Sequence, residues 1–155
     1  MRPSRHETML MICEVIGQRS TCPRRNCGCV LTDHLGRVLS MGHNGVAVGE
    51  PHCKDTGGEF DRRCPGADLP SGTGLDKCQA IHAEQNALMF CADVDRIDVA
   101  YVSASPCFLC LHMLKNTGCR LIVFRNVYPG WDDGLSFDWM NSADGRGWLQ
   151  VPRGM

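Results

Sequence analysis

The sequence predicts an α/β protein with three layers, α/β/α, in which helices cover both faces of a mixed central sheet. Helical and strand-like hydrophobic patterns follow one another in the order α-β-β-α-β-α-β, which favours this arrangement. The chain has 155 residues, a length that suits one hydrophobic core and is cramped for two. Hydrophobic residues make up 43% of the chain and charged residues 21%, as in ordinary globular proteins. We therefore expect residues 1–155 to form a single domain.

The N-terminal half predicts one helix and a pair of strands. Residues 7–19 are apolar at helical spacing and predict an amphipathic helix. Residues 27–32 and 37–41 predict two strands that are joined by a short polar turn. The segment 42–76 has no clean hydrophobic period and is rich in Gly, Pro and charged residues. It is too long for an ordinary loop, so we expect the irregular insertion at about 45–76 to be functional or braced by metal.

The C-terminal half predicts two helices that alternate with two strands. A helix is expected at about 76–92, a short buried strand at 99–104, a helix at 107–117 and a strand at 120–124. No further element is predicted in the tail, residues 126–155. This tail contains all three tryptophans of the chain, Trp131, Trp139 and Trp148.

Charge and cysteine content narrow the class of protein. The net charge of −1 argues against a polymeric nucleic-acid partner that is bound through its phosphates. No apolar stretch approaches the ~20 residues that span a bilayer, so we expect no membrane partner. The N-terminus does not resemble a secretion signal, so we expect a cytoplasmic protein. The 11 cysteines are an odd number, which favours metal ligands and buried small side chains over disulfides.

Two short motifs predict a catalytic metal site. His82 is followed two residues later by Glu84, and Pro106 precedes a Cys107-x-x-Cys110 pair. One imidazole and two thiolates are three ligands of a tetrahedral zinc ion, with the fourth position left open as in catalytic sites. Glu84 can then move a proton between water and a substrate nitrogen. Either motif alone is weak, because a lone C-x-x-C is equally typical of half a structural zinc site or of a redox pair, but both together match the pattern of zinc deaminases.

Most of the chain, from Arg19 to about Asp133, resembles the cytidine/deoxycytidylate deaminase superfamily, and in particular the deoxycytidylate (dCMP) deaminases of bacteria and bacteriophages. The motifs that carry this resemblance are Arg19-Ser20-Thr21-Cys22, Gly42-His43-Asn44-Gly45, His82-Ala83-Glu84-Gln85-Asn86-Ala87, Ser105-Pro106-Cys107 and Tyr128-Pro129-Gly130-Trp131-Asp132-Asp133. The resemblance implies a cytidine-deaminase-like fold and the hydrolysis of dCMP to dUMP and ammonia, which feeds thymidylate synthesis.

Alternatives to this activity stay open. The same chemistry on dCTP, cytidine or a modified dCMP is the nearest alternative. A polynucleotide deaminase is less favoured because the net charge is −1. A catalytically silent nucleotide-binding module is also less favoured, because His82, Glu84, Cys107 and Cys110 are all present.

The resemblance also implies roles for residues around the motifs. Glu84 would protonate the base and help to expel the amine. Ala83 would offer a backbone group to the base, Ser105 would offer its carbonyl to the leaving amine, and Asn44 would bind the sugar. From the residues alone, the sequence Asn44-Gly45 is equally typical of a tight turn.

The phosphate of a nucleotide needs a cation or a helix N-terminus. Arg24, Arg25 and the segment 125–128 are candidates, because both regions should open toward the active end of the sheet. For each arginine an ordinary exposed side chain is at least an equal alternative, and Tyr128 is equally compatible with core packing.

Many members of the family are hexamers that dCTP activates and dTTP inhibits, so the resemblance implies a homo-oligomer and effectors, which could bring Mg²⁺. His43 and Ala47 depart from the family's turn Gly-Tyr-Asn-Gly-x-Pro, and this departure bears on regulation rather than on catalysis. The aromatic residues Trp131, Phe137 and Trp139 suit a subunit interface, a cap over the phosphate or core packing.

The nine remaining cysteines divide into two groups by position. Five fall on apolar positions or on a strand and are expected to be packing residues: Cys13, Cys27, Cys29, Cys91 and Cys119. Four lie in loops or at element edges around the irregular segment: Cys22, Cys53, Cys64 and Cys78. These four could close a second, structural zinc site, as the resemblance to some family members also suggests, and His52 could replace one thiol. Scattered free thiols are the alternative.

Overall fold

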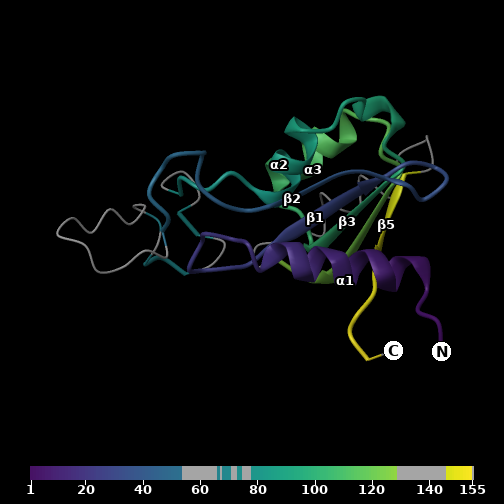
Figure 1. Ribbon diagram of the computed structural model, residues 1–155, viewed down its shortest axis with the longest axis horizontal. Helices are drawn as coiled ribbons and strands as arrows, with labels where there is room; N and C mark the ends of the chain where they lie inside the picture. The colour runs from purple at the N-terminus through teal and green to yellow at the C-terminus, as the bar shows by residue number, and fades with distance from the viewer. Residues whose placement is uncertain (54–65, 67, 71–72, 75–77, 129–145, 155) are drawn as a thin grey trace.

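The sheet of this protein is mixed and lies between helices (Figure 1). The computed structural model describes residues 1–53, 66, 68–70, 73–74, 78–128 and 146–154. Within them, the five strands are β1 (Gly28–Thr32), β2 (Val38–His43), β3 (Val99–Ala104), β4 (Leu121–Asn126) and β5 (Gly147–Gln150). They lie in the order β2-β1-β3-β4-β5. β1 is antiparallel to β2 and β3, whereas β3, β4 and β5 run parallel to one another.

Helices cover both faces of this sheet, which confirms the predicted three layers. α1 (Arg5–Gly17) lies on one face, and α2 (Ala83–Met89) and α3 (Phe108–Lys115) lie side by side on the other (Figure 1). A short 3₁₀ turn, η2 (Val94–Arg96), leads from α2 toward β3. Among the described residues, no helix is long and apolar enough to cross a membrane.

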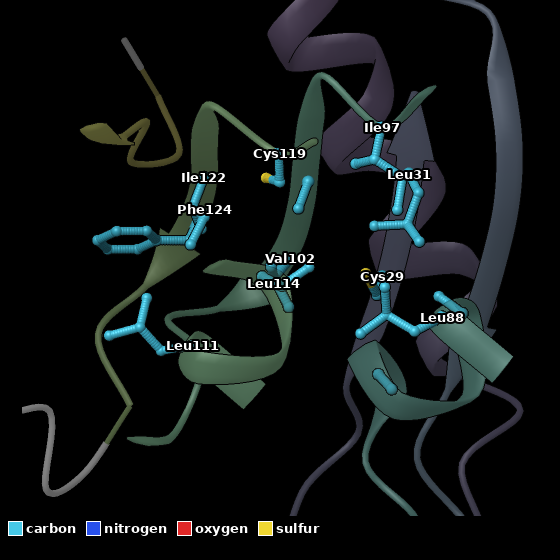
Figure 2. Packing of buried hydrophobic residues seen from close by; sticks show 13 residues of the cluster. Cys29, Leu31, Leu88, Ile97, Val102, Leu111, Leu114, Cys119, Ile122 and Phe124 are labelled. Atoms are coloured by element: carbon cyan, nitrogen blue, oxygen red, sulfur yellow. The ribbon is translucent and has the colours of Figure 1, made fainter. Parts of the chain in front are cut away.

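The core has two halves, because successive side chains of a strand point to opposite faces. In β1, Cys29 and Leu31 belong to the half under α2 and α3, whereas Val30 belongs to the half under α1. Figure 2 shows the first half, where Leu111 and Leu114 of α3 face the sheet. Strands buried on both faces read as continuous apolar runs, which is why β3 and β4 are easily found in the sequence.

Close packing brings α2 onto β2. A Cβ atom added to Gly42 would lie 2.7 Å from the Ala83 carbonyl oxygen, so only glycine lets the helix approach this closely. Ser40 donates a hydrogen bond to the Ala87 carbonyl from the same strand. The beginning of α2 is therefore fixed against the end of β2, and the active-site motif that it carries is fixed with it.

Two predicted elements differ from the structure. The helix expected at 76–92 forms only over Ala83–Met89, because Ile81 is extended and pairs with Gly45 as an isolated β-bridge. The tail contains a strand that was not predicted, β5. Its four residues carry no recognisable alternation, and its pairing with β4 is supported by a contact of the Trp148 ring with Phe124, 5.6 Å between centroids.

Candidate active site

The candidate site lies where two helices begin. His82 is the N-cap residue of α2, and Cys107 is the N-cap residue of α3, directly after β3. The Gln85 side chain accepts a hydrogen bond from the backbone N–H of His82, and the Asn86 side chain donates one to the carbonyl of His43. These contacts hold the N-terminus of α2 beside the end of β2. Because β2 and β3 run in the same direction, the N-terminus of α3, which follows β3, lies at the same end of the sheet.

Three side chains meet there in the geometry of metal ligands. The Nδ1 atom of His82 lies 3.4 Å from the Cys107 Sγ atom and 3.3 Å from the Cys110 Sγ atom. A tetrahedral zinc ion with bonds of about 2.3 Å to sulfur and about 2.0 Å to nitrogen holds such ligands roughly 3.5 Å apart. The donor set and its spacing therefore fit zinc, and they leave one coordination position for a further ligand.

The ionisation of these three groups is coupled through their mutual contacts. A hydrogen bond with Cys110 and the contact with His82 lower the pKa of Cys107 to about 4, although burial opposes this shift. The hydrogen bond with Cys107, together with burial, raises the pKa of Cys110. Hydrogen bonding to Cys107 also raises the pKa of His82. The protons shared by this cluster are those that a zinc ion displaces when it binds.

Glu84 lies beside the three ligands, in the first turn of α2, and its side chain is buried. Burial raises the pKa of its carboxyl group. Because the carboxyl lines the same pocket as His82 and Cys107, it is placed to exchange protons with a molecule bound there.

One pocket joins these residues with the predicted substrate-binding residues. Its described lining residues are Cys22, Arg24, Arg25, Cys27, Asn44, Cys78, Ala80, His82, Ala83, Glu84, Ala104, Ser105, Cys107 and Tyr128. Six of the residues considered for substrate binding from the sequence are among them: Arg24, Arg25, Asn44, Ala83, Ser105 and Tyr128. Cys27, which was expected only to pack, also lines the pocket while its side chain packs against the core.

Asn44 connects the turn after β2 to the segment before β1. Its Nδ2 atom donates to the carbonyl of Arg25, 2.9 Å away, and its Oδ1 atom accepts from the backbone N–H of Cys27 at 2.9 Å. The side chain is buried in this bridge. Asn44 therefore fixes the backbone on both sides of Asn26 at the wall of the pocket.

Ser105 and Tyr128 are fixed to each other. The hydroxyl oxygen of Ser105 accepts a hydrogen bond from the backbone N–H of Tyr128 at 2.7 Å, and the backbone N–H of Ser105 donates to the Asn126 carbonyl. The end of β4 is thereby joined to the loop between β3 and α3, so the Tyr128 ring forms a defined wall of the pocket.

Arg125, within a segment considered for phosphate binding, points away from the pocket. Its side chain is 1% exposed and forms ion pairs with Glu7 and Glu14 of α1. It also donates to the carbonyl of Val151. Because Arg125 follows the alternation of β4, its side chain shares the α1 face with Val123. Arg125 is a buried structural ion and does not line the pocket.

The cysteines expected to hold a second metal are only partly brought together. Cys22 and Cys78 line the pocket, and Cys78 packs against Cys53, which is buried. Cys64 lies outside the described residues, as do Trp131, Phe137 and Trp139. Within the part of the chain that the structure describes, His82, Cys107 and Cys110 form the one cluster whose ligand atoms are close enough to hold a metal ion.

A His–Cys–Cys metal site beside a buried glutamate, at the helix N-termini of a three-layer fold, is typical of the zinc-dependent deaminases of bases and nucleotides. The family model "Cytidine and deoxycytidylate deaminase zinc-binding region" matches residues 3–126. The chain belongs to this cytidine and deoxycytidylate deaminase family, and the zinc expected from the donor set is the metal of the family.

Relatives and solved structures agree with this assignment. The chain is 33% identical over 124 residues to the deoxycytidylate deaminase of Mycobacterium phage D29, a match that covers 79% of this chain and 95% of that protein. It is 31% identical over 132 residues to that of Schizosaccharomyces pombe, covering 82% of this chain and 38% of the longer yeast protein. Its fold is similar to the dCMP deaminase of cyanophage S-TIM5 in complex with dCMP and dUMP, with a TM-score of 0.70, 24% identity and coverage of 97% and 99% of the two chains.

Proposed function

We propose that this protein hydrolyses dCMP to dUMP and ammonia. The observation that carries the proposal is that one pocket contains both a zinc-type ligand set and a buried glutamate. The chain is also 33% identical to a deoxycytidylate deaminase. Family members share the metal chemistry, and the similarity to proteins named for dCMP selects this substrate among them.

His82, Cys107 and Cys110 would hold the zinc ion. When bound there, zinc would act as a Lewis acid that makes water nucleophilic at neutral pH. The role of Glu84 is proton transfer: it accepts the proton of the attacking water and delivers it to N3 of the cytosine ring. Glu84 would then carry the remaining proton of that water, on the new C4 hydroxyl group, to the amino group. The C4–N bond breaks, ammonia leaves, and the C4 oxygen becomes the carbonyl of uracil. The walls of the pocket would exclude bulk water during these steps.

Backbone groups near the ligands would position the base. Ala83 is buried in the first turn of α2, and we assign its backbone to base recognition. Ser105 is buried next to Cys107, and we assign its carbonyl to the leaving amine. The second Nδ2 proton of Asn44 would reach the sugar, because the first is used in the bond to the Arg25 carbonyl.

The test is a comparison of ammonia release from dCMP, dCTP, deoxycytidine and cytidine by purified zinc-loaded protein, with and without dCTP or dTTP. We expect dCMP to have the highest kcat/KM. A higher kcat/KM for dCTP or cytidine would assign the same chemistry to the other substrate. An absence of deamination with every one of them, in protein that holds zinc, would refute the function.

We also propose a second, structural zinc ion at Cys22, Cys53, Cys64 and Cys78, with His52 as a possible replacement for one thiol. The support is the packing of Cys78 against Cys53 and the position of Cys22 with Cys78 at the pocket wall. Metal analysis is expected to find about two zinc ions per chain, falling to about one in a Cys53→Ser variant with lower thermal stability. One zinc ion in the unaltered protein, or unchanged stability in the variant, would contradict this site.

Assembly and regulation are further parts of the proposal. We propose that residues 1–155 act as one domain and that the chain forms a homo-oligomer, a hexamer by resemblance. Support comes from large apolar side chains left exposed on or next to α2 and α3: Met89, Phe90, Phe108, Leu109 and Met113. Light scattering of the purified chain measures the mass of the particle, and a monomeric mass at micromolar concentration would exclude this assembly.

Control by dCTP and dTTP, with Mg²⁺ bound to the effector, is proposed from the family resemblance of the sequence, and the same kinetic assay measures it. We propose a cytoplasmic location, in a bacterium or a phage-infected cell. It is supported by the thiols of Cys107 and Cys110, which a reducing compartment keeps available to a metal ion.

A further inference from the structure

The guanidinium group of Arg25 is held at the pocket with an unused hydrogen-bond donor. Its Cζ atom lies over the Tyr128 ring, 4.8 Å from the ring centroid. Its Nη1 atom is buried and has no hydrogen-bond partner. A buried donor without an acceptor is unfavourable, and a cationic one more so. Arg25 therefore retains a donor that can bind an acceptor group of a molecule in the pocket.

The neighbouring Arg24 is used differently. Its Nη1 atom donates to the carbonyls of Leu69, Pro70 and Thr73, at 3.3, 3.0 and 2.7 Å. These contacts fasten the irregular segment beside the pocket and use the Nη1 donor of Arg24 within the protein. Of the two arginines that line the described pocket, Arg25 is the one with a free buried donor.

The position of Arg25 is set by residues already on the pocket wall. Asn44 binds the Arg25 carbonyl and the Cys27 N–H, which fixes the backbone that carries the arginine. Tyr128, whose own N–H is bound to the Ser105 hydroxyl, supplies the ring on which the guanidinium stacks. A planar guanidinium held in this way loses little freedom when it binds an oxyanion.

We propose that Arg25 is the specificity residue that binds the 5′-phosphate of the substrate. This inference rests on the proposed function. It gives the 5′-phosphate of dCMP, which the metal site does not contact, a binding partner in the protein. Cytosine and deoxyribose are neutral, and the phosphate is the charged group of the nucleotide, so it is the group that best matches a half-buried cation whose Nη1 donor is buried. The guanidinium fork can meet two phosphate oxygens with parallel hydrogen bonds. Asn44 and Tyr128 are positioning residues for Arg25.

The experiment compares dCMP with deoxycytidine for the wild type, Arg25→Gln, Arg25→Lys and Arg24→Gln, with Arg2→Gln as an exposed control for the loss of one positive charge. We expect Arg25→Gln to raise KM for dCMP about 10- to 100-fold, the effect of losing hydrogen bonds to a charged group. Its kinetics with deoxycytidine should change less than threefold. Arg25→Lys should be intermediate, since lysine keeps the charge and loses the planar fork.

The preference for dCMP over deoxycytidine decides the outcome. If it is unchanged in Arg25→Gln, or if it is lost in Arg24→Gln instead, the assignment of Arg25 is overturned. If Arg25→Gln does not fold, Arg25→Lys takes its place. That variant loses the planar fork and its stacking on Tyr128, so an unchanged preference for dCMP over deoxycytidine in it would also contradict the proposal. A wild-type protein that deaminates neither compound would instead refute the proposed function, so the two failures are distinguishable.

Discussion

The two faces of the sheet bury charged side chains in opposite ways. On the α1 face, Arg125 is 1% exposed and meets both Glu7 and Glu14 through short ion pairs. On the other face, Glu84 is buried beside the metal ligands, at the wall of a pocket. A buried charge whose hydrogen bonds are all satisfied within the protein holds elements together. A buried charge that faces a pocket is available to a ligand. We therefore call the face of α1, with Arg125, the supporting face, and the face of α2 and α3, with Glu84, the chemical face.

The largest effect is expected from Glu84→Gln on the chemical face. The amide keeps the size of the side chain but cannot carry the proton, so kcat should fall by about 10² to 10⁴. Zinc content and thermal unfolding temperature should stay close to those of the wild type. Ammonia release and metal analysis measure both quantities. The exposed Glu50→Gln is the matched control, and substantial activity in Glu84→Gln would contradict the assigned role.

On the supporting face, Arg125→Met should act on stability instead of chemistry. Removal of the arginine leaves Glu7 without this ion pair and Glu14 paired only with the exposed Arg153. The loss costs about 3 kcal/mol in the free energy of unfolding; the lower end of the usual range applies because both carboxylates are partly exposed. The folded variant should keep its kcat within about tenfold, since its chemical groups are untouched. Urea unfolding gives the free energy. A loss of kcat greater than tenfold in the folded variant, with little change in the free energy of unfolding, would contradict the difference between the two faces.

The pH dependence of the free energy of unfolding should reveal the ion pair between Arg125 and Glu7. Hydrogen bonding to Arg125 lowers the pKa of Glu7. Such a carboxyl stabilises the fold above its unfolded pKa of about 4.3, and this contribution is lost as the pH falls through the lower, folded value. The stability difference between wild type and Arg125→Met should therefore shrink when unfolding is measured from about pH 7 down to about pH 3. A constant difference would show that Glu7 is not the partner responsible.

The smallest effect is expected where an ion pair lies in solvent. Arg120 binds Asp98 with a distance of 2.6 Å from Nε to Oδ1, but its side chain is 60% exposed. Arg120→Gln should lower the free energy of unfolding by about 0.2 to 1 kcal/mol. Urea unfolding beside Arg125→Met tests whether burial sets the size of the effect. Equal losses in the two variants would contradict this explanation.

Several features of the fold could be predicted because their signals are local. β3 and β4 are continuous apolar runs, and α1 and α3 have helical spacing, so their positions differ from the prediction by few residues. The beginning of α2 could not be placed, because the bridge from Ile81 to Gly45 joins residues far apart in the sequence. β5 was missed for the same reason: its pairing with β4 depends on a contact of Trp148 with Phe124.

The sequence by itself predicted the candidate metal cluster and the glutamate beside it, because His82, Glu84, Cys107 and Cys110 lie in two short motifs with the spacing of a zinc deaminase. The structure brings the three candidate ligands together. Only the tertiary structure distinguished the arginines. Arg24, Arg25 and Arg125 are alike in the sequence, yet one binds loop carbonyls, one stacks on Tyr128 at the pocket, and one pairs with α1. The physical reason is that a guanidinium takes its role from the acceptors around it, and those acceptors come from distant parts of the chain.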